Sequence, residues 1–65
     1  MLVKISDSLA QIRKENGKIY LITDTSGGWR IKDITQPGGV VYKVSHGMCV
    51  KLDEVEKYIN GSSLF

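Results

Sequence analysis

The chain has 65 residues, a formal net charge of +2 and 42% hydrophobic residues. A chain of this length forms one domain at most, buries only about 60% of the surface that its unfolded form exposes, and rarely gains more than about 3–5 kcal/mol from its core. A large substrate-enclosing cleft is therefore excluded, and the weak positive charge argues against tight nonspecific binding to nucleic acid at physiological salt.

The cysteine count and the hydropathy of the chain bear on metal binding and on the cellular compartment of the protein. One cysteine, Cys49, cannot form an internal disulfide, and one Cys with one His cannot supply the four ligands of a structural zinc site, so no metal and no cofactor are expected. The chain shows neither the apolar run of a signal peptide nor that of a membrane span, so we expect a cytoplasmic protein without membrane contact. A small core that is held by neither a disulfide nor a metal must be closely packed or gain stability from a partner, which can be a second copy of the chain in a homodimer.

The first third of the chain allows two interpretations. Val3 and Ile5 alternate with polar residues, which predicts a short edge strand. For residues 7–16 we favour a brief helix that Gly17 ends as its C-cap. The alternative is a β-hairpin in which Asn16-Gly17 forms a type I′ turn and residues 12–15 pair with residues 18–21, because Asn-Gly is the strongest short-range hairpin signal. The prediction here is thus a short N-terminal strand or helix.

Strands and a helix follow in chain order. Segments rich in β-branched and aromatic residues, separated by Gly- and Pro-containing turns, predict strands at 18–23, 29–34 and 40–45, with a short continuation at 48–50. Residues 52–59 carry apolar side chains at helical spacing, and Gly61 marks the helix stop. The fold class is therefore α+β: a three- or four-stranded antiparallel meander packed on a C-terminal helix, with residues 1–61 as a single domain and 62–65 as a tail. A small SH3-like barrel closed by the helix is the alternative form.

Alternation along the strands sorts the side chains into two faces. The apolar face is expected to form the core and holds Trp29, Ile31, Val40, Tyr42, Val44, Met48 and Val50. The opposite face carries four cations, Arg30, Lys32, Lys43 and Lys51. These four residues are the candidate binding surface for an acidic protein or a nucleic acid, and the structural alternative is an ordinary solvated face of a one-sided sheet. With Trp29 in the core, base stacking on this face is not expected.

No catalytic constellation stands out. His46 and Cys49 are the only base and nucleophile pair available, and a spacing of three residues places them on opposite faces of a strand. His46 is expected in a turn and Cys49 as a small buried hydrophobe. The chain is therefore expected not to be an enzyme.

Two interpretations compete for the tail that ends in Leu64 and Phe65. The tail either folds back to cover the core, or offers these two residues as a linear motif to a groove on another protein. The ending Ser63-Leu64-Phe65 is similar to the Leu-Phe ending of bacterial sliding-clamp-binding peptides, without the glutamine that such peptides usually carry.

A second resemblance covers residues 43–59, which resemble the wing and following helix of small excisionase-type winged-helix proteins. That family binds DNA through a helix-turn-helix ahead of the wing, whereas the upstream residues here predict strands. The resemblance implies a nucleic-acid-binding regulator, which is the alternative function. The favoured expectation is a small non-enzymatic binding module that regulates or inhibits a protein partner, of the kind that accessory and phage-encoded proteins often are.

Overall fold

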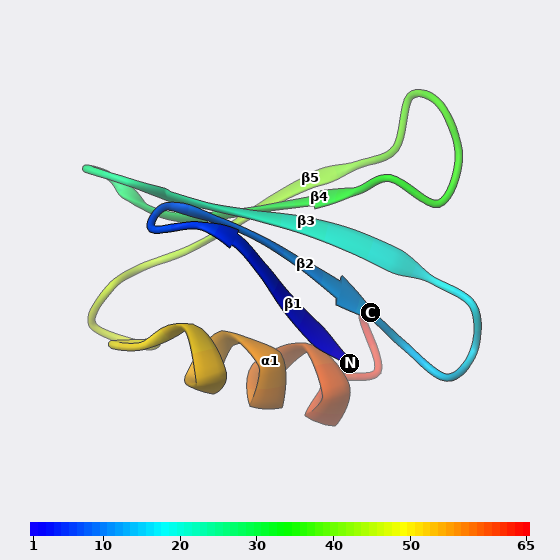
Figure 1. The fold of residues 1–65 in the computed structure, drawn as a ribbon. Helices are drawn as coiled ribbons and strands as arrows, with labels where there is room; N and C mark the ends of the chain where they lie inside the picture. Colours follow the sequence, from blue (N-terminus) through cyan, green and yellow to red (C-terminus); the bar gives the residue numbers. More distant parts are fainter.

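The computed structural model describes all residues from 1 to 65 and shows one antiparallel sheet with one helix (Figure 1). Each strand pairs with the next in the chain, which gives the sheet order β1-β2-β3-β4-β5. The elements are β1 Leu2–Ser6, β2 Leu9–Arg13, β3 Ile19–Thr25, β4 Gly28–Asp33, β5 Val41–Val44 and α1 Leu52–Gly61. The α+β class and the meander with a C-terminal helix are as predicted, with five strands in place of three or four.

The extra strand is β2, where we favoured a helix, and that preference is wrong. The segment is a strand because it pairs with β1 on one side and with β3 on the other. Its alternate residues Ala10 and Ile12 point into the core and are 1% and 0% exposed. The turn into β3 has a three-residue loop closed by a 2.9 Å bond from the Lys14 N–H to the Lys18 carbonyl. Gly17, at φ +91°, occupies the left-handed position of a type I turn with a G1 bulge, not the type I′ turn of the hairpin alternative.

Two further details differ from the sequence prediction. Residues 48–50 form no strand, and Met48 and Val50 are 64% and 67% exposed, because the chain leaves the sheet after Val44 and crosses toward the helix. Val40 lies just before β5 and is also exposed. The helix runs through Gly61, so this glycine does not act as a left-handed stop.

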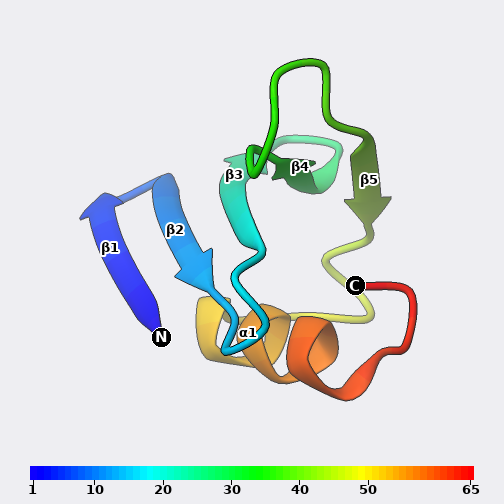
Figure 2. The same cartoon turned by 90° about the vertical axis from the view of Figure 1, so that its right-hand side faces the viewer.

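The core lies between one face of the sheet and α1, and no element covers the other face (Figures 1 and 2). It consists of Ala10, Ile12, Tyr20, Ile22, Trp29, Ile31, Val44, Cys49, Val55, Ile59 and Phe65. The predicted burial of Trp29, Ile31, Val44 and Cys49 is confirmed.

The edges of the sheet stay apart. Strand β1 pairs only with β2 and β5 only with β4, so the sheet is open and the SH3-like barrel finds no support. The chain has a single helix and no helix-turn-helix, so the winged-helix resemblance does not extend to the fold. None of the structure's helical segments has the length and apolar character needed to cross a membrane.

Candidate functional site

The helix-free face of the sheet, called here the open face, gathers three of the four predicted cations. Arg30 and Lys32 on β4 and Lys43 on β5 are all exposed and point away from the core, since their neighbours Trp29, Ile31 and Val44 point into it. Arg30 and Lys43 are direct cross-strand partners. Lys32 stands opposite Val41, one step further along the same two strands.

The spacing of the Arg30 and Lys43 side chains follows from the hydrogen-bond pattern. The Asp33 N–H donates to the Val40 carbonyl at 3.0 Å, which marks Asp33 and Val40 as a hydrogen-bonded pair. Because such pairs alternate along antiparallel strands, Arg30 and Lys43 form a non-hydrogen-bonded pair, the type whose side chains lie closer together. Like charges in this position repel and destabilise the sheet.

No carboxylate relieves this repulsion from within the open face. Asp24 and Asp33, the two acidic residues on the strands, have the same register parity as Trp29 and Ile31 and so lie on the helix side. Asp24 is held there by the imidazole Nε2 of His46 at 2.7 Å. Hydrogen bonds from the side chain and then the main chain of Thr35 lower the pKa of Asp33.

One cation of this face was not predicted from the sequence, and another predicted cation lies elsewhere. Arg13 lies at the far end of the open face, opposite Ile19, and was overlooked because residues 7–16 were assigned to a helix. The hairpin alternative would have put Arg13 on a strand, but its two-residue turn sets Arg13 opposite Tyr20, one residue away from the observed partner Ile19. Lys51, in contrast, is the N-cap residue of α1 and lies on the helix side of the sheet, so its predicted position beside the other three cations is wrong.

Apolar residues complete the open face. Ile19, Leu21 and Val41 lie on it, half-buried or exposed, and Val3 adds to them at 40% exposure. No aromatic ring lies on the open face, because Tyr20, Trp29 and Tyr42 point toward the helix and the other two aromatic residues belong to α1 and the tail.

A shallow depression of about 590 Å³ borders this surface. Its lining includes Arg30, Val41 and Lys43, together with Thr25 and Gly27 from the turn between β3 and β4. An anionic side chain in this depression would contact the unneutralised cationic pair directly.

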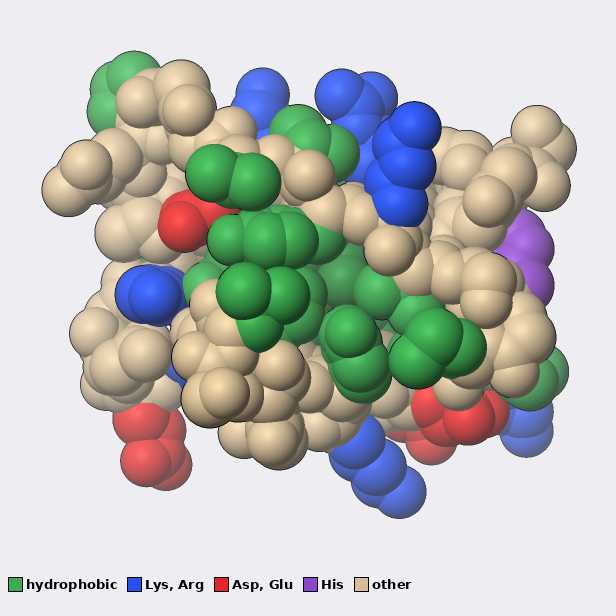
Figure 3. Space-filling model, turned by 180° about the vertical axis from the view of Figure 1, so that it is seen from behind, with side chains coloured by type: hydrophobic (Ala, Val, Ile, Leu, Met, Phe, Trp, Pro, Cys, Tyr) green, Lys and Arg blue, Asp and Glu red, His purple; other side chains and the backbone are tan.

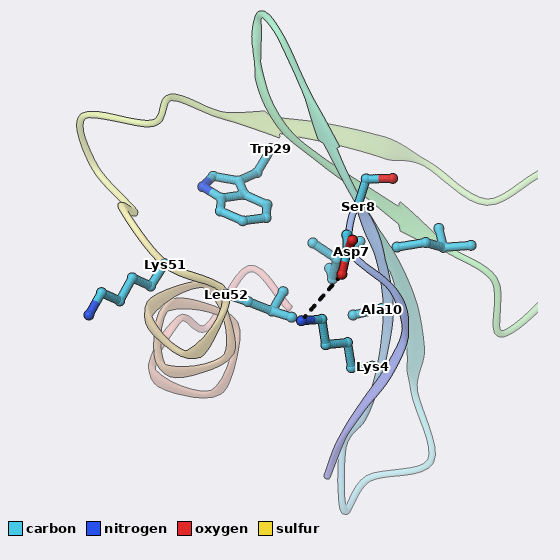
Figure 4. Close-up of a pocket in the computed structure, with 9 residues that line it drawn as sticks. Lys4, Asp7, Ser8, Ala10, Trp29, Lys51 and Leu52 are labelled. Carbon is cyan, nitrogen blue, oxygen red and sulfur yellow. Dashed lines mark ion pairs between the residues drawn. The ribbon is translucent and has the colours of Figure 1, made fainter.

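A second pocket, of about 250 Å³, opens on the helix side between the β1–β2 turn and the start of α1 (Figure 4). Ala10, Trp29 and Leu52 supply apolar lining, and the exposed ion pair between Lys4 and Asp7, at 3.9 Å, lies at its side. All buried polar side-chain atoms of the protein have partners, so no unpaired buried group is available there to orient a ligand.

No hydrogen bond joins His46 to Cys49. His46 is exposed in the turn after β5, bonds to Asp24 and packs edge-on against the Trp29 ring at 5.6 Å. Cys49 is 3% exposed and its carbonyl accepts a hydrogen bond from the indole N–H of Trp29. Burial, with Glu54 adding to it, raises the pKa of the Cys49 thiol and so disfavours the thiolate that nucleophilic chemistry needs.

The tail folds back onto the core. Phe65 is 3% exposed, its ring makes edge contacts with Tyr20, Tyr42 and Tyr58, and its main-chain oxygen accepts a hydrogen bond from the Tyr20 hydroxyl at 3.1 Å. Leu64 stays 58% exposed. In this conformation the Phe65 ring is not offered to a groove on another protein.

Comparison with known proteins adds no relative: no family model matches the chain, and neither characterised proteins nor solved structures give a significant match. The open face, with its cationic pair and apolar neighbours, is the strongest candidate for a functional surface of this molecule.

Proposed function

We propose that this chain is a non-enzymatic binding module that regulates or inhibits an acidic protein partner through its open face. The observation that supports it is the cross-strand pair of Arg30 and Lys43, with Lys32 beside it and no strand carboxylate on the same face. This arrangement costs stability in the free protein. A partner that places carboxylates between these cations gains attraction and removes the repulsion, which gives the interaction both affinity and specificity.

The apolar side chains of the open face favour a protein over a nucleic acid. Ile19, Leu21 and Val41 would be desolvated by an apolar partner surface, whereas single-stranded nucleic acid is bound on exposed aromatic rings, which this face does not have. With three cations side by side, the open face can also neutralise only a few phosphates. The lone cysteine is typical of proteins of a reducing compartment, and the proposed site of action is the cytoplasm.

The test is an amide NMR titration of the labelled protein with three probes: an acidic polypeptide, a single-stranded DNA and a DNA duplex, each at low and at physiological salt. The expected result is that the acidic polypeptide shifts the amides around Arg30, Lys32 and Lys43 and that the two DNAs do not at physiological salt. Salt-resistant shifts at the same amides with DNA would instead assign the face to nucleic acid.

Charge-reversal variants supply the control. Arg30→Glu with Lys43→Glu is expected to abolish the shifts. Lys51→Glu with Lys57→Glu changes the net charge equally but alters only exposed residues of the helix side, and should leave the shifts in place. Equal loss in both double variants would mean that net charge, not the open face, drives binding, and would refute the proposal.

A further inference from the structure

Strand β5 leaves its outer edge unpaired, since β4 is its only neighbour in the sheet. The bonded pair of Asp33 and Val40 fixes which residues face that edge: main-chain groups alternate in direction, so Val41 and Lys43 direct their N–H and carbonyl groups outward. Their main-chain groups make no hydrogen bond to a turn, a loop or the tail. The edge is therefore a free template for one more strand.

The opposite edge of the sheet, strand β1, differs in two respects. Its pairing with β2 shifts register between Lys4 and Ser6, and Lys4 is a charged residue on the helix-facing side of the strand. A bulge and an inward-pointing charge are the devices by which natural sheets prevent further strands from adding. Strand β5 has neither: its helix-facing residues are Tyr42 and Val44, and its pairing with β4 is regular.

An apolar surface adjoins β5 on the helix side. Tyr42 and Tyr58 are half-buried and hold the Phe65 ring between them, with ring centroids 4.7 and 5.8 Å away, and the neighbouring Leu64 is 58% exposed. Figure 3, which looks onto the β5 side of the molecule, shows hydrophobic side chains gathered across the middle of this view and Lys and Arg side chains above them. One face of an added strand would thus lie beside this apolar surface and the other face beside the cations.

We propose that the acidic partner binds β5 as a sixth, extended strand whose residues alternate between acidic and apolar. Side chains two apart in that strand would stand on the open face beside Lys43 and Val41, with Arg30 and Lys32 one strand further away on the same face. The intervening side chains would lie against Tyr42 and the exposed Leu64. This inference rests on the proposed function and specifies how its partner is recognised, by main-chain bonds for affinity and alternate side chains for specificity.

Charge decides between this occupant and a second copy of the chain. Pairing β5 with β5 of another copy would bring Arg30 and Lys43 of both copies onto one continuous face that holds no strand carboxylate. An acidic strand neutralises these charges, whereas a second copy doubles their repulsion.

The probe is an eight-residue peptide of four glutamate-valine repeats, compared with a peptide of the same composition in two blocks, four glutamates followed by four valines. Hydrogen exchange of the protein's amides is the readout. With the alternating peptide, we expect exchange at Val41 and Lys43 to slow, and exchange along β1 to stay unchanged. The block peptide should give neither effect at the same concentration.

Val41→Pro tests the main-chain contribution, since it removes an edge-facing donor, keeps Lys43 and leaves the β4 ladder intact. It should weaken the alternating peptide about tenfold. If this variant does not fold, a peptide N-methylated at the valines or at the glutamates gives the same test with the unchanged protein, because only one of the two sets can face β5.

The outcomes separate the two proposals. Shifts around Arg30 and Lys43 without protection of the Val41 amide would refute strand addition and leave binding to the open face standing. No shift with any acidic probe would refute both. Protection of Val41 and Lys43 in the free protein, with the mass of a dimer in sedimentation, would show that a second copy occupies the edge and would also overturn the inference.

Discussion

The structural role of the tail gives the sharpest stability prediction. Phe65 is 3% exposed and its ring meets three tyrosine rings edge-on, with centroids 5.4 Å from Tyr20, 4.7 Å from Tyr42 and 5.8 Å from Tyr58. Phe65→Ala would remove all three contacts and leave a cavity in the core. Such truncations in a core cost about 3–5 kcal/mol of unfolding free energy.

That cost equals the whole stability expected of a domain of this size, about 3–5 kcal/mol, so the variant should be largely unfolded at room temperature. Leu64→Ala is the matched control, because Leu64 is 58% exposed and its truncation should cost only about 0.5 kcal/mol. Urea denaturation followed by Trp29 fluorescence and by circular dichroism measures both. A loss below about 1 kcal/mol for Phe65→Ala would mean that the ring does not belong to the core, and would restore the linear-motif interpretation.

Three further predictions concern backbone, thiol and carboxylate. Gly28→Ala should cost about 2 kcal/mol or more, because φ is +125° and the new Cβ would lie 2.6 Å from the Val44 carbonyl oxygen, whereas Gly27→Ala, with its nearest atom at 4.0 Å, should be neutral in the same melting assay. Cys49, whose pKa is raised by burial, should be alkylated at mildly alkaline pH more slowly than a free model thiol, and denaturant should remove the difference; equal rates would contradict its buried position. Asp33, whose pKa is lowered by hydrogen bonds from Thr35, contributes stability above about pH 4 that is lost as the pH falls through the lower native value, so Asp33→Asn should show a shallower acid-induced loss of melting temperature than the parent protein.

The local sequence pattern was sufficient to predict the strands in the centre of the chain and the helix near its end. Strands β3, β4 and β5 are rich in β-branched and aromatic residues and are separated by turn residues, and α1 repeats its apolar side chains at helical spacing, so the pattern of each segment allows one interpretation. The same alternation correctly separated buried Trp29 and Ile31 from exposed Arg30 and Lys32. That separation is what made the cationic face predictable.

The segment of β2 was ambiguous for a physical reason. Leu9 and Ile12 lie three apart, as on a helix, while Ala10 and Ile12 lie two apart, as on a strand, and alanine is too small to weigh strongly in either pattern. Pairing with both β1 and β3 decided for the strand. The error hid Arg13 from the predicted site, because a residue assigned to a helix cannot be placed on a sheet face.

The fold class, most element positions and the sides on which Arg30, Lys32 and Lys43 lie were predictable because side-chain periodicity is a local property. The three-dimensional fold was needed to place Lys51 away from this face and Phe65 in the core. It alone shows that β5 keeps a free edge beside the cations. These features depend on which distant segments meet, and no local period encodes that.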